Sequence, residues 1–590
     1  MKQLQFTFRD DYGLDVELRK LRQWYNSGLI STLLIQFYTE DLDRQRIEHV
    51  CRRIEAALPE ALLIGCSSNG NIVRGDFSGG SIALVCTLFE YPSTRVEVLQ
   101  YPLTAQNQAD VARSLRDAVQ SRGWVKGVEM LTTIRGMSMT ALCEGLSQLP
   151  ESVQVFGGGA FCEDLNRNDA FVYSKAAGYL EQGIVFVLFG GEDFHLETSF
   201  VTGWKPLGSY LNVTATDGHI LRELNGKPAY DTYYKYLHIR NDENFFYNTL
   251  EFPFLYRYNG IDIMRAPISS NPDGSLTMTS DMAQNVQARI AYGDPWTILE
   301  SAWQEGNRLL ERAPECILVF SCAARRTFWG NEEVGKETEP YQQVAPTSGF
   351  YTSGEFLRTG GFVNQHNVTQ VLAAMREGDP GERTPQKLAM AEHTLEGKVS
   401  MINRMATFIK ATTEELEAAN RKLSELAVTD VLTGLGNKNA YFERVRQLDA
   451  GIAAKSAAFR VVVLDMNGLK TINDTYSHEC GDIAIADVAE ALKAVFGREA
   501  LYRVGGDEFI AILEGAAQDD LGARFDALEI ELDKTGTGDR PYRDRLTVSR
   551  GAADFLPGRD KEYREVFRRA DEAMYEHKAA YYRDHDRRRR

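Results

Sequence analysis

The sequence predicts a multidomain protein of the α/β and α+β classes, because its pattern changes twice along the chain. Up to about residue 375, short apolar runs alternate with amphipathic segments, which is typical of buried strands covered by helices. Residues 384–427 instead carry an apolar residue at every seventh position, and strand-like and helix-like segments return from about residue 428. A chain of 590 residues also exceeds the size of a single hydrophobic core.

Composition and charge exclude several classes of protein. The net charge of −17 argues against a broad nucleic-acid-binding surface, because phosphate backbones would be repelled. Apolar runs stay well short of the roughly 18–20 residues that a membrane span requires. The opening MKQLQFTFRDDYG lacks the apolar core of a secretory signal. The eight cysteines form no C-x-x-C pair, which predicts reduced thiols in a cytoplasmic protein.

The first region predicts buried strands at five apolar runs that are bounded by glycine and polar residues. They are STLLIQFY (31–38), ALLIGC (61–66), GSIALVCTLF (80–89), GIVFVLF (183–189) and CILVFSC (316–322). Such runs belong to mixed sheets with helices on their faces. No repeat with a period of 20–50 residues is evident in the sequence.

A linker and a helical repeat follow. REGDPGERTPQ (376–386) is polar and contains two prolines, which suits a linker. Leucine or isoleucine then recurs every seventh residue from Leu388 to Leu423. This period keeps one seam facing a partner helix, so residues 384–427 are expected to form a dimeric coiled coil. The alternative is a single amphipathic helix that packs on its own domain.

Two polar sites in the third region suggest nucleotide chemistry. Apolar runs at 500–504 and 509–513 flank Gly505-Gly506-Asp507-Glu508. This predicts a hairpin whose glycines adopt positive φ and admit a phosphate or base, although an ordinary hairpin turn is the simpler reading. Asp465 ends the apolar strand 459–464. It could cap the next helix, or it could bind Mg²⁺ together with Asp507.

The third region resembles the GGDEF-domain diguanylate cyclases over its whole length. The matching segments are DVLTGLGNKNAYFERV (430–445), VVVLDMNGLKTINDTYSHECGD (461–482), YRVGGDEFIAIL (502–513), LTVSRGAA (546–553) and ADEAMYEHK (570–578). The resemblance implies a palm-like domain over residues 428–590, an antiparallel-containing sheet covered by helices. It also implies condensation of two GTP molecules into cyclic di-GMP with release of two pyrophosphates.

The same resemblance implies roles for individual residues. Asp465, Asp507 and the carbonyl of Met466 would hold Mg²⁺ or Mn²⁺. Glu508 would lie beside the metal and the reacting 3′-hydroxyl, as ligand or proton acceptor. Asn473 and Asp482 would read the guanine edge. The triphosphate would be held by Lys470, Lys578 and backbone amides of Asn467 to Leu469, and Gly506 would leave room for the nucleotide.

The implied reaction requires a homodimer, because each domain holds one GTP and two must face each other. The sequence also departs from the family. The arginine of the family's inhibitory site is replaced by Phe496, so product inhibition through that site is not expected. The final helix lacks the usual G-R after Lys578, so one phosphate contact is expected either to be lost or to move to Arg583. The alternative function is a catalytically weak domain that only binds GTP or cyclic di-GMP.

Residues 28–378 resemble the FIST sensory domain of bacterial signalling proteins. The motifs are LLIGCSSNGNI (62–72), FGGGAFCED (156–164), GWKPLG (203–208), NGKPAYDTYYKYL (225–237), VFSCAARR (319–326) and GFYTSGEF (349–356). We expect an extension over 1–27 and two α/β halves over 28–205 and 206–378. The resemblance implies a small-molecule ligand. A zwitterion could be bound by Arg325, Tyr351 and Glu355. A histidine at position 49, 195, 219, 238 or 366 could bind haem. For all of these residues an ordinary structural role is the alternative.

Overall fold

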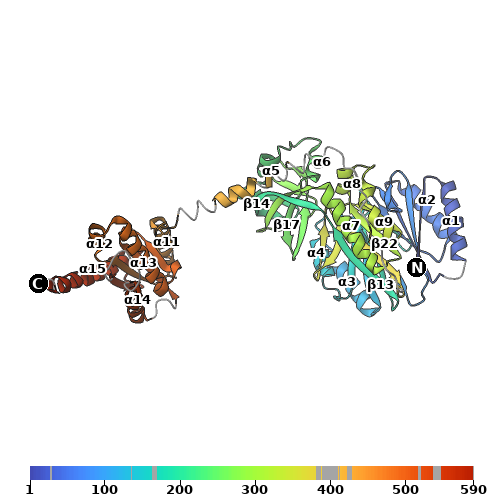
Figure 1. Ribbon diagram of the computed structural model, residues 1–590. Helices are drawn as coiled ribbons and strands as arrows, with labels where there is room; N and C mark the ends of the chain where they lie inside the picture. Colours follow the sequence, from blue (N-terminus) through green and yellow to red (C-terminus); the bar gives the residue numbers. More distant parts are fainter. Residues whose placement is uncertain are drawn as a thin grey trace. The chain divides into compact units, whose positions relative to one another are not determined.

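The computed structural model divides the chain into two compact units, Met1–Ala411 and Thr412–Arg590 (Figure 1). It describes residues 1–26, 30–134, 136–162, 169–380, 387–388, 405, 409–410, 412–420, 428–515, 520–535 and 546–588. The expected coiled coil at 384–427 falls almost entirely outside these residues, so its pairing stays a prediction. Within it, residues 412–420 are helical and Leu416 is exposed.

The core of the first unit consists of three structural repeats, each built from an edge strand, a β–α–β unit, a short hairpin and a return strand. The first contains β1 (Lys2–Phe8), α1 (Asp11–Tyr25), β2 (Thr32–Thr39), α2 (Arg44–Ala57), β3 (Leu62–Ser67), β4 (Asn71–Val73), β5 (Asp76–Ser78) and β6 (Ile82–Phe89). The segment expected as an N-terminal extension therefore supplies β1 and α1 of this repeat.

The other two repeats keep the same order of elements. The second contains β7 (Arg95–Pro102), α3 (Gln108–Ser121), β8 (Val125–Thr132), α4 (Thr140–Leu146), β9 (Gln154–Gly159), β10 (Val172–Ser174), β11 (Gly178–Leu180) and β12 (Gly183–Gly190). The third contains β13 (Phe194–Val201), α7 (Pro295–Arg312), β22 (Cys316–Cys322), α8 (Ala323–Trp329), η1 (Val334–Glu337), α9 (Glu339–Val344), β23 (Thr347–Thr352), β24 (Glu355–Thr359), β25 (Phe362–His366) and β26 (Gln370–Glu377).

The repeats exchange their hairpins in a ring, which locks the unit together. The strand orders are β1-β6-β2-β3-β10-β11, β7-β12-β8-β9-β24-β25 and β13-β26-β22-β23-β4-β5. Each sheet thus ends in the hairpin of another repeat. In every sheet the two strands of the β–α–β unit are parallel and the other neighbours are antiparallel.

Backbone hydrogen bonds repeat the same exchange at the strand ends. In each case an amide one or two residues after the end of β3, β9 or β23 donates to a carbonyl at or next to the end of the corresponding strand in another repeat. The bonds join Phe161 N to Ser67 O at 3.0 Å, Ser353 N to Gly159 O at 3.0 Å, and Asn69 N to Tyr351 O at 2.9 Å. The three repeats therefore obey an approximate threefold rule down to single hydrogen bonds.

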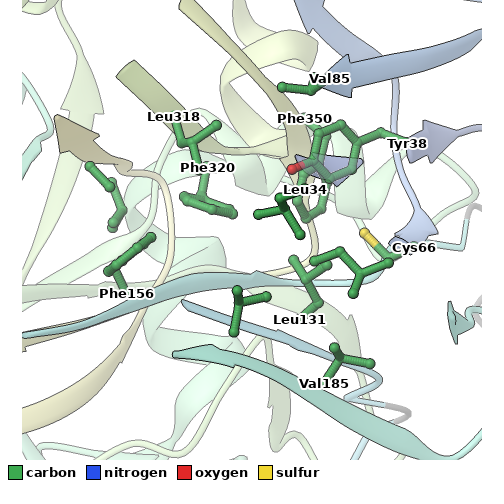
Figure 2. Close-up of a cluster of buried hydrophobic side chains, with 14 of the residues drawn as sticks. Leu34, Tyr38, Cys66, Val85, Leu131, Phe156, Val185, Leu318, Phe320 and Phe350 are labelled. Atoms are coloured by element: carbon green, nitrogen blue, oxygen red, sulfur yellow. The ribbon is translucent and has the colours of Figure 1, made fainter. Parts of the chain in front are cut away.

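The largest buried cluster lies where the inner faces of the three sheets meet (Figure 2). Tyr38 from the first sheet stacks on Phe350 from the third, with ring centroids 4.6 Å apart. Phe156 from the second sheet lies 6.0 Å from Phe320 of the third. The outer faces carry separate clusters under their own helices. Because these strands are buried on both faces, they read as continuous apolar runs, and all five expected strands are present.

An insertion between β13 and α7 forms a separate antiparallel sheet with its own core. Its elements are β14 (Trp204–Asp217), β15 (Ile220–Leu224), β16 (Lys227–Pro228), α5 (Ala229–Leu237), α6 (Phe245–Leu250), β17 (Phe254–Tyr258), β18 (Ile261–Arg265), β19 (Pro267–Ser270), β20 (Leu276–Met278) and β21 (Gln287–Gly293). The third repeat is thus interrupted and then completed after residue 294.

The second unit is a four-stranded antiparallel sheet, in the order β28-β29-β27-β30, with helices on both faces. Its elements are α11 (Lys438–Ala453), β27 (Phe459–Met466), α12 (Leu469–Thr475), α13 (His478–Phe496), η2 (Arg498–Ala500), β28 (Leu501–Arg503), β29 (Glu508–Glu514), α14 (Leu521–Thr535), β30 (Val548–Asp554) and α15 (Tyr563–Arg588). The predicted strand at 459–464 and the predicted hairpin of 500–504 and 509–513 are present.

Among the helices that the structure describes, none has the length and apolar character needed to cross a membrane. The eight cysteines are free thiols, and all except the partly exposed Cys480 are buried. Burial raises the pKa of several of them, including that of Cys143 to about 12, so these thiols are unreactive core residues.

Candidate active site

The two predicted carboxylates meet at the ends of neighbouring strands of the second unit. In the antiparallel pair of β27 and β29, Asp465 lies opposite Glu508. The amide of Met466 donates to the carbonyl of Asp507 at 2.9 Å, which fixes the turn residue beside the end of β27. The strand register therefore brings Asp465, Asp507 and Glu508 to one edge of the sheet.

Asp465 is a buried carboxylate with a cationic partner. Its residue is 4% exposed, and its Oδ1 accepts a 2.6 Å bond from the ammonium of Lys578 on α15. Burial raises the pKa of Asp465 above its ordinary value; Lys578 opposes this shift, and the charge of Asp507 adds to it. This end of the sheet therefore concentrates negative charge, which a bound cation would neutralise.

The two glycines of the turn differ in their structural roles. The expectation of positive φ at Gly505 and Gly506 is wrong, since neither lies among the positive-φ residues of the described chain. A Cβ on Gly505 would lie 2.8 Å from Oε2 of Glu508, so a side chain there would displace that carboxylate. A Cβ on Gly506 would meet no described atom within 4 Å. The fold alone does not demand glycine at position 506.

An arginine on β28 connects this turn to the start of the domain. Arg503 donates from Nη2 to the carbonyl of Gly506 at 2.8 Å and from Nη1 to Oδ1 of Asp430 at 3.1 Å. Burial would raise the pKa of Asp430, but hydrogen bonds from Thr433 and Arg503 hold it below its ordinary value. Sequence reasoning gave Asp430 and Arg503 no role, although both lie in the matching motifs.

The predicted guanine-reading residues lie on two packed helices. Asn473 is on α12 and Asp482 is on the exposed first part of α13, and the two helices are in contact. Oδ1 of Asn473 is buried and has no hydrogen-bond partner in the described part of the chain. A Cβ on Gly481 would lie 1.8 Å from this oxygen, so the glycine makes room for the amide.

The predicted phosphate-binding segment lies between β27 and α12. Gly468 has φ +76°, a conformation that glycine adopts readily, and it turns the chain into the helix. Lys470 is exposed on the first turn. The amide of Asn467 donates to Thr547 O at 2.9 Å. The expected roles of the Asn467 and Leu469 amides in phosphate binding stay predictions.

Two departures from the family pattern have structural counterparts. Phe496 ends α13, is 5% exposed and lies 6.5 Å from the ring of Phe525. Position 496 therefore belongs to the core and presents no side chain to a ligand. Arg583 is exposed on α15.

The sensor candidates in the first unit are held by other protein groups. Arg325 is fully buried and ion-paired with Glu337 at 2.9 Å. Glu355 accepts hydrogen bonds from Thr352 and Thr369, and burial raises its pKa to about 7. Nη2 of Arg325 and the hydroxyl of Tyr351 are buried without a partner in the described chain, so zwitterion binding by Arg325, Tyr351 and Glu355 stays a prediction. The five histidines are dispersed, and no group of three or more metal-ligating side chains occurs in the described residues.

Family models match three successive segments of the chain. The FIST N domain matches residues 32–227, the FIST C domain matches 229–358, and the diguanylate cyclase GGDEF domain matches 427–583.

Two curated relatives match about a quarter of the chain. The bifunctional diguanylate cyclase/cyclic di-GMP phosphodiesterase MucR of Pseudomonas aeruginosa is 32% identical over 161 residues, which are 27% of this chain and 23% of MucR. Diguanylate cyclase DgcS of Shewanella oneidensis is 28% identical over 161 residues, or 27% of this chain and 52% of DgcS. The chain thus spans about half of DgcS and less of MucR.

A solved structure matches about a third of the chain. The coiled coil and GGDEF domain of DgcB from Caulobacter crescentus, in complex with cyclic di-GMP, is 27% identical. It covers 31% of this chain and 95% of its own, with a TM-score of 0.27.

Proposed function

We propose that this chain, which carries FIST N, FIST C and GGDEF domains, is a diguanylate cyclase that condenses two GTP molecules into cyclic di-GMP. The observation that carries the proposal is the placement of Asp465 and Asp507 at the ends of adjacent strands, where Lys578 donates a hydrogen bond to Asp465. The named relatives MucR and DgcS carry the same activity in their descriptions.

The carboxylates fit a divalent cation. Asp465 and Asp507 supply hard oxygen donors, and the Met466 carbonyl at the end of β27 is a third. Mg²⁺ or Mn²⁺ takes one or two carboxylates and completes its shell with water and substrate phosphates. The raised pKa of the buried Asp465 also favours a bound cation, which would replace the proton as its counter-charge.

The remaining residues would hold one GTP in each domain. Asn473 Oδ1 is a buried acceptor without a protein partner in the described chain, which suits the amino group of guanine, and Asp482 would accept from the same edge. Lys470 and the Leu469 amide would contact the triphosphate. Lys578 would transfer from Asp465 to a phosphate once a cation is bound. Gly506 would leave the space above the turn to the nucleotide.

Catalysis then depends on positioning two such half-sites in a homodimer. The 3′-oxygen of each GTP attacks the α-phosphorus of the other, two phosphodiester bonds form, and two pyrophosphates leave. The bound cation would neutralise charge on the reacting phosphates. Glu508, beside Asp465 in the strand register, would accept the proton of the 3′-hydroxyl or complete the cation's ligands.

The first unit would regulate this reaction. In this proposal residues 28–205 and 206–378 form the FIST sensor, 384–427 a coiled-coil signalling helix, and 428–590 the cyclase domain of a cytoplasmic protein. Such a helix would join the units directly, so a change in its pairing would move the two half-sites relative to each other. A ligand could shift this equilibrium only by its difference in affinity for the two states.

Incubation of the full-length chain with GTP and Mg²⁺, followed by chromatography of the nucleotides, tests the proposal. We expect cyclic di-GMP and pyrophosphate in a ratio of one to two, and no cyclic product from ATP. A protein that binds GTP but makes no product would contradict it and favour the binding-module alternative.

A further inference from the structure

A cavity of about 530 Å³ lies in the first unit between α4, the inserted sheet and the exchanged β24–β25 hairpin. Its polar wall includes Arg265, Asp281, Asn364 and Gln365. Its apolar wall includes Met139, Tyr256, Tyr258, Met282 and Phe362. The volume is in the range of protein sites for small organic ligands. This wall is separate from the residues Arg325, Tyr351 and Glu355 considered above.

The wall contains a buried arginine without an ion-pair partner in the described part of the chain. Arg265 ends β18 and is 6% exposed. It donates from Nε to the backbone carbonyl of Asp281 at 2.8 Å, and from Nη1 to Met264 O at 2.9 Å. These acceptors orient the guanidinium but carry no formal charge. Buried charges are normally paired, so the site favours an anion from outside the protein.

Two amide side chains add hydrogen-bond donors to the same wall. Asn364 and Gln365 are 4% and 8% exposed, and Nδ2 of the first and Nε2 of the second have no partner in the described chain. Oδ1 of Asn364 accepts from Nδ2 of Asn259 at 3.1 Å, which fixes its amide orientation. Unpaired buried donors are costly, and a ligand oxygen would satisfy them.

Two acidic groups lie near this wall. Oδ2 of Asp281 accepts from the hydroxyls of Ser138 and Thr140. Its Oδ1 is buried without a partner in the described chain, so an amine is the competing ligand that the experiment must exclude. Glu144 is exposed at the rim. His366, next in sequence to Gln365, is fully buried; burial and then the charge of Arg265 lower its pKa to about 3, so it stays neutral.

The exchanged hairpins contact helices directly in all three sheets, and in the second sheet β25 packs on α4. In the first sheet Tyr173 donates to Glu55 of α2 at 2.9 Å, and Arg44 stacks on Tyr179. In the third, Thr338 donates to the carbonyl of Gly75 at 2.6 Å. In the second, the inserted sheet stands beside the hairpin, with β18 in contact with β25, and its residues frame the cavity.

We propose that this cavity binds a small organic monocarboxylate with an apolar body, its carboxylate on Arg265 and Asn364 and its body against Tyr256, Tyr258 and Phe362. Binding stands independently of catalysis. Control of cyclic di-GMP synthesis by this ligand rests on the proposed function, and a binding assay separates the failure of one from the failure of the other.

Calorimetric titration of the full-length chain tests the ligand class. The probes are 3-phenylpropanoate and 4-methylpentanoate, each compared with its neutral amide and with the amine of equal length. We expect both carboxylates to bind at least about tenfold more tightly than the amides, as a charge-assisted bond predicts. Tighter binding of the amines, or dissociation constants above about 1 mM for both carboxylates, would overturn the proposal.

Variants of the wall test the location. Arg265→Gln should lower carboxylate affinity at least about tenfold. Arg289→Gln is the matched control, because Arg289 also lies in the inserted sheet and donates to a backbone carbonyl, that of Gly208, outside the cavity. Asn364→Asp keeps the side-chain shape and should weaken carboxylates while strengthening amines, so it serves even where Arg265→Gln impairs folding. Unchanged selectivity in Asn364→Asp would overturn the assignment.

Discussion

Arg503 and Asp430 form an ion pair that connects the segment before α11 to the turn of the candidate active site. Nη1 of Arg503 lies 3.1 Å from Oδ1 and 3.3 Å from Oδ2 of Asp430. The same guanidinium donates to the carbonyl of Gly506, one residue before Asp507. A displacement where the chain enters the domain would therefore reach the turn through a single side chain.

Asp430→Asn should lower cyclase activity about tenfold, a loss of 1.4 kcal/mol, because Arg503 would no longer be held from both sides. The free energy of unfolding should fall by only about 1 kcal/mol or less, since the pair is partly exposed. The control is Glu514→Gln at the end of β29, which removes the charge from the partly exposed pair between Glu514 and Arg444 of α11. Turnover and urea unfolding of both variants check this; equal activities would contradict it.

Gly481→Ala should raise the KM for GTP about tenfold with a smaller change in kcat. The added methyl would overlap Oδ1 of Asn473, which would have to leave its position. Glu490→Ala, at an exposed position of the same helix, should leave the KM unchanged. Steady-state kinetics measure the KM of both variants. An unaltered KM for GTP in Gly481→Ala would show that Asn473 does not bind guanine.

Glu129 makes the stability of the first unit depend on pH. It is fully buried beside Gln36, and burial raises its pKa from 4.5 to about 8. Between these two values the native chain holds a proton that the unfolded chain releases. Each rise of one pH unit in this window therefore lowers the free energy of unfolding by about 1.4 kcal/mol.

Glu129→Gln keeps the shape without the titration. The variant should match the wild type near pH 5 and be more stable by roughly 2–4 kcal/mol near pH 8. Glu60→Gln, at an exposed site, should show no such difference. Thermal unfolding across this pH range measures it, and parallel curves for wild type and Glu129→Gln would refute the assignment.

Cyclic di-GMP should inhibit the proposed cyclase reaction only by competing with GTP. Phe496 fills the core where the family's inhibitory site has arginine, so position 496 offers no guanidinium to the product. Initial rates at several GTP concentrations should show a raised apparent KM and a constant maximal rate. Non-competitive inhibition would reveal a product site elsewhere on the chain.

Sequence reasoning located the second unit well because its chemistry is encoded in short motifs. Asp465 and Asp507 follow apolar runs, and antiparallel pairing then places them together. The Arg503–Asp430 pair was missed because its partners are far apart in sequence and nothing local marks the contact. The φ angles of Gly505 and Gly506 were predicted wrongly, since glycine serves here to leave space and not to reach a left-handed conformation.

The threefold organisation of the first unit could not be predicted from the sequence, for other reasons. The repeats begin at Lys2, Arg95 and Phe194, so their spacing is longer than the 20–50 residues of common repeat proteins, and the inserted sheet interrupts the third. Each repeat also fills its part of the shared core with different apolar residues, such as Tyr38, Leu131 and Phe320. The hairpin exchange is a tertiary feature, because any short hairpin could equally pair within its own repeat.

The most direct test of the proposed active site is a measurement of the catalytic role of Asp507. Cyclic di-GMP production from GTP and Mg²⁺ should be measured for wild type, Asp507→Asn and Asp526→Asn, the last an exposed aspartate on α14. Asparagine keeps the shape of the turn but removes a charged oxygen donor, so we predict a loss of about 100-fold or more in kcat with an unchanged fold. Asp526→Asn should retain full activity. Near-normal turnover by Asp507→Asn would contradict the proposed active site.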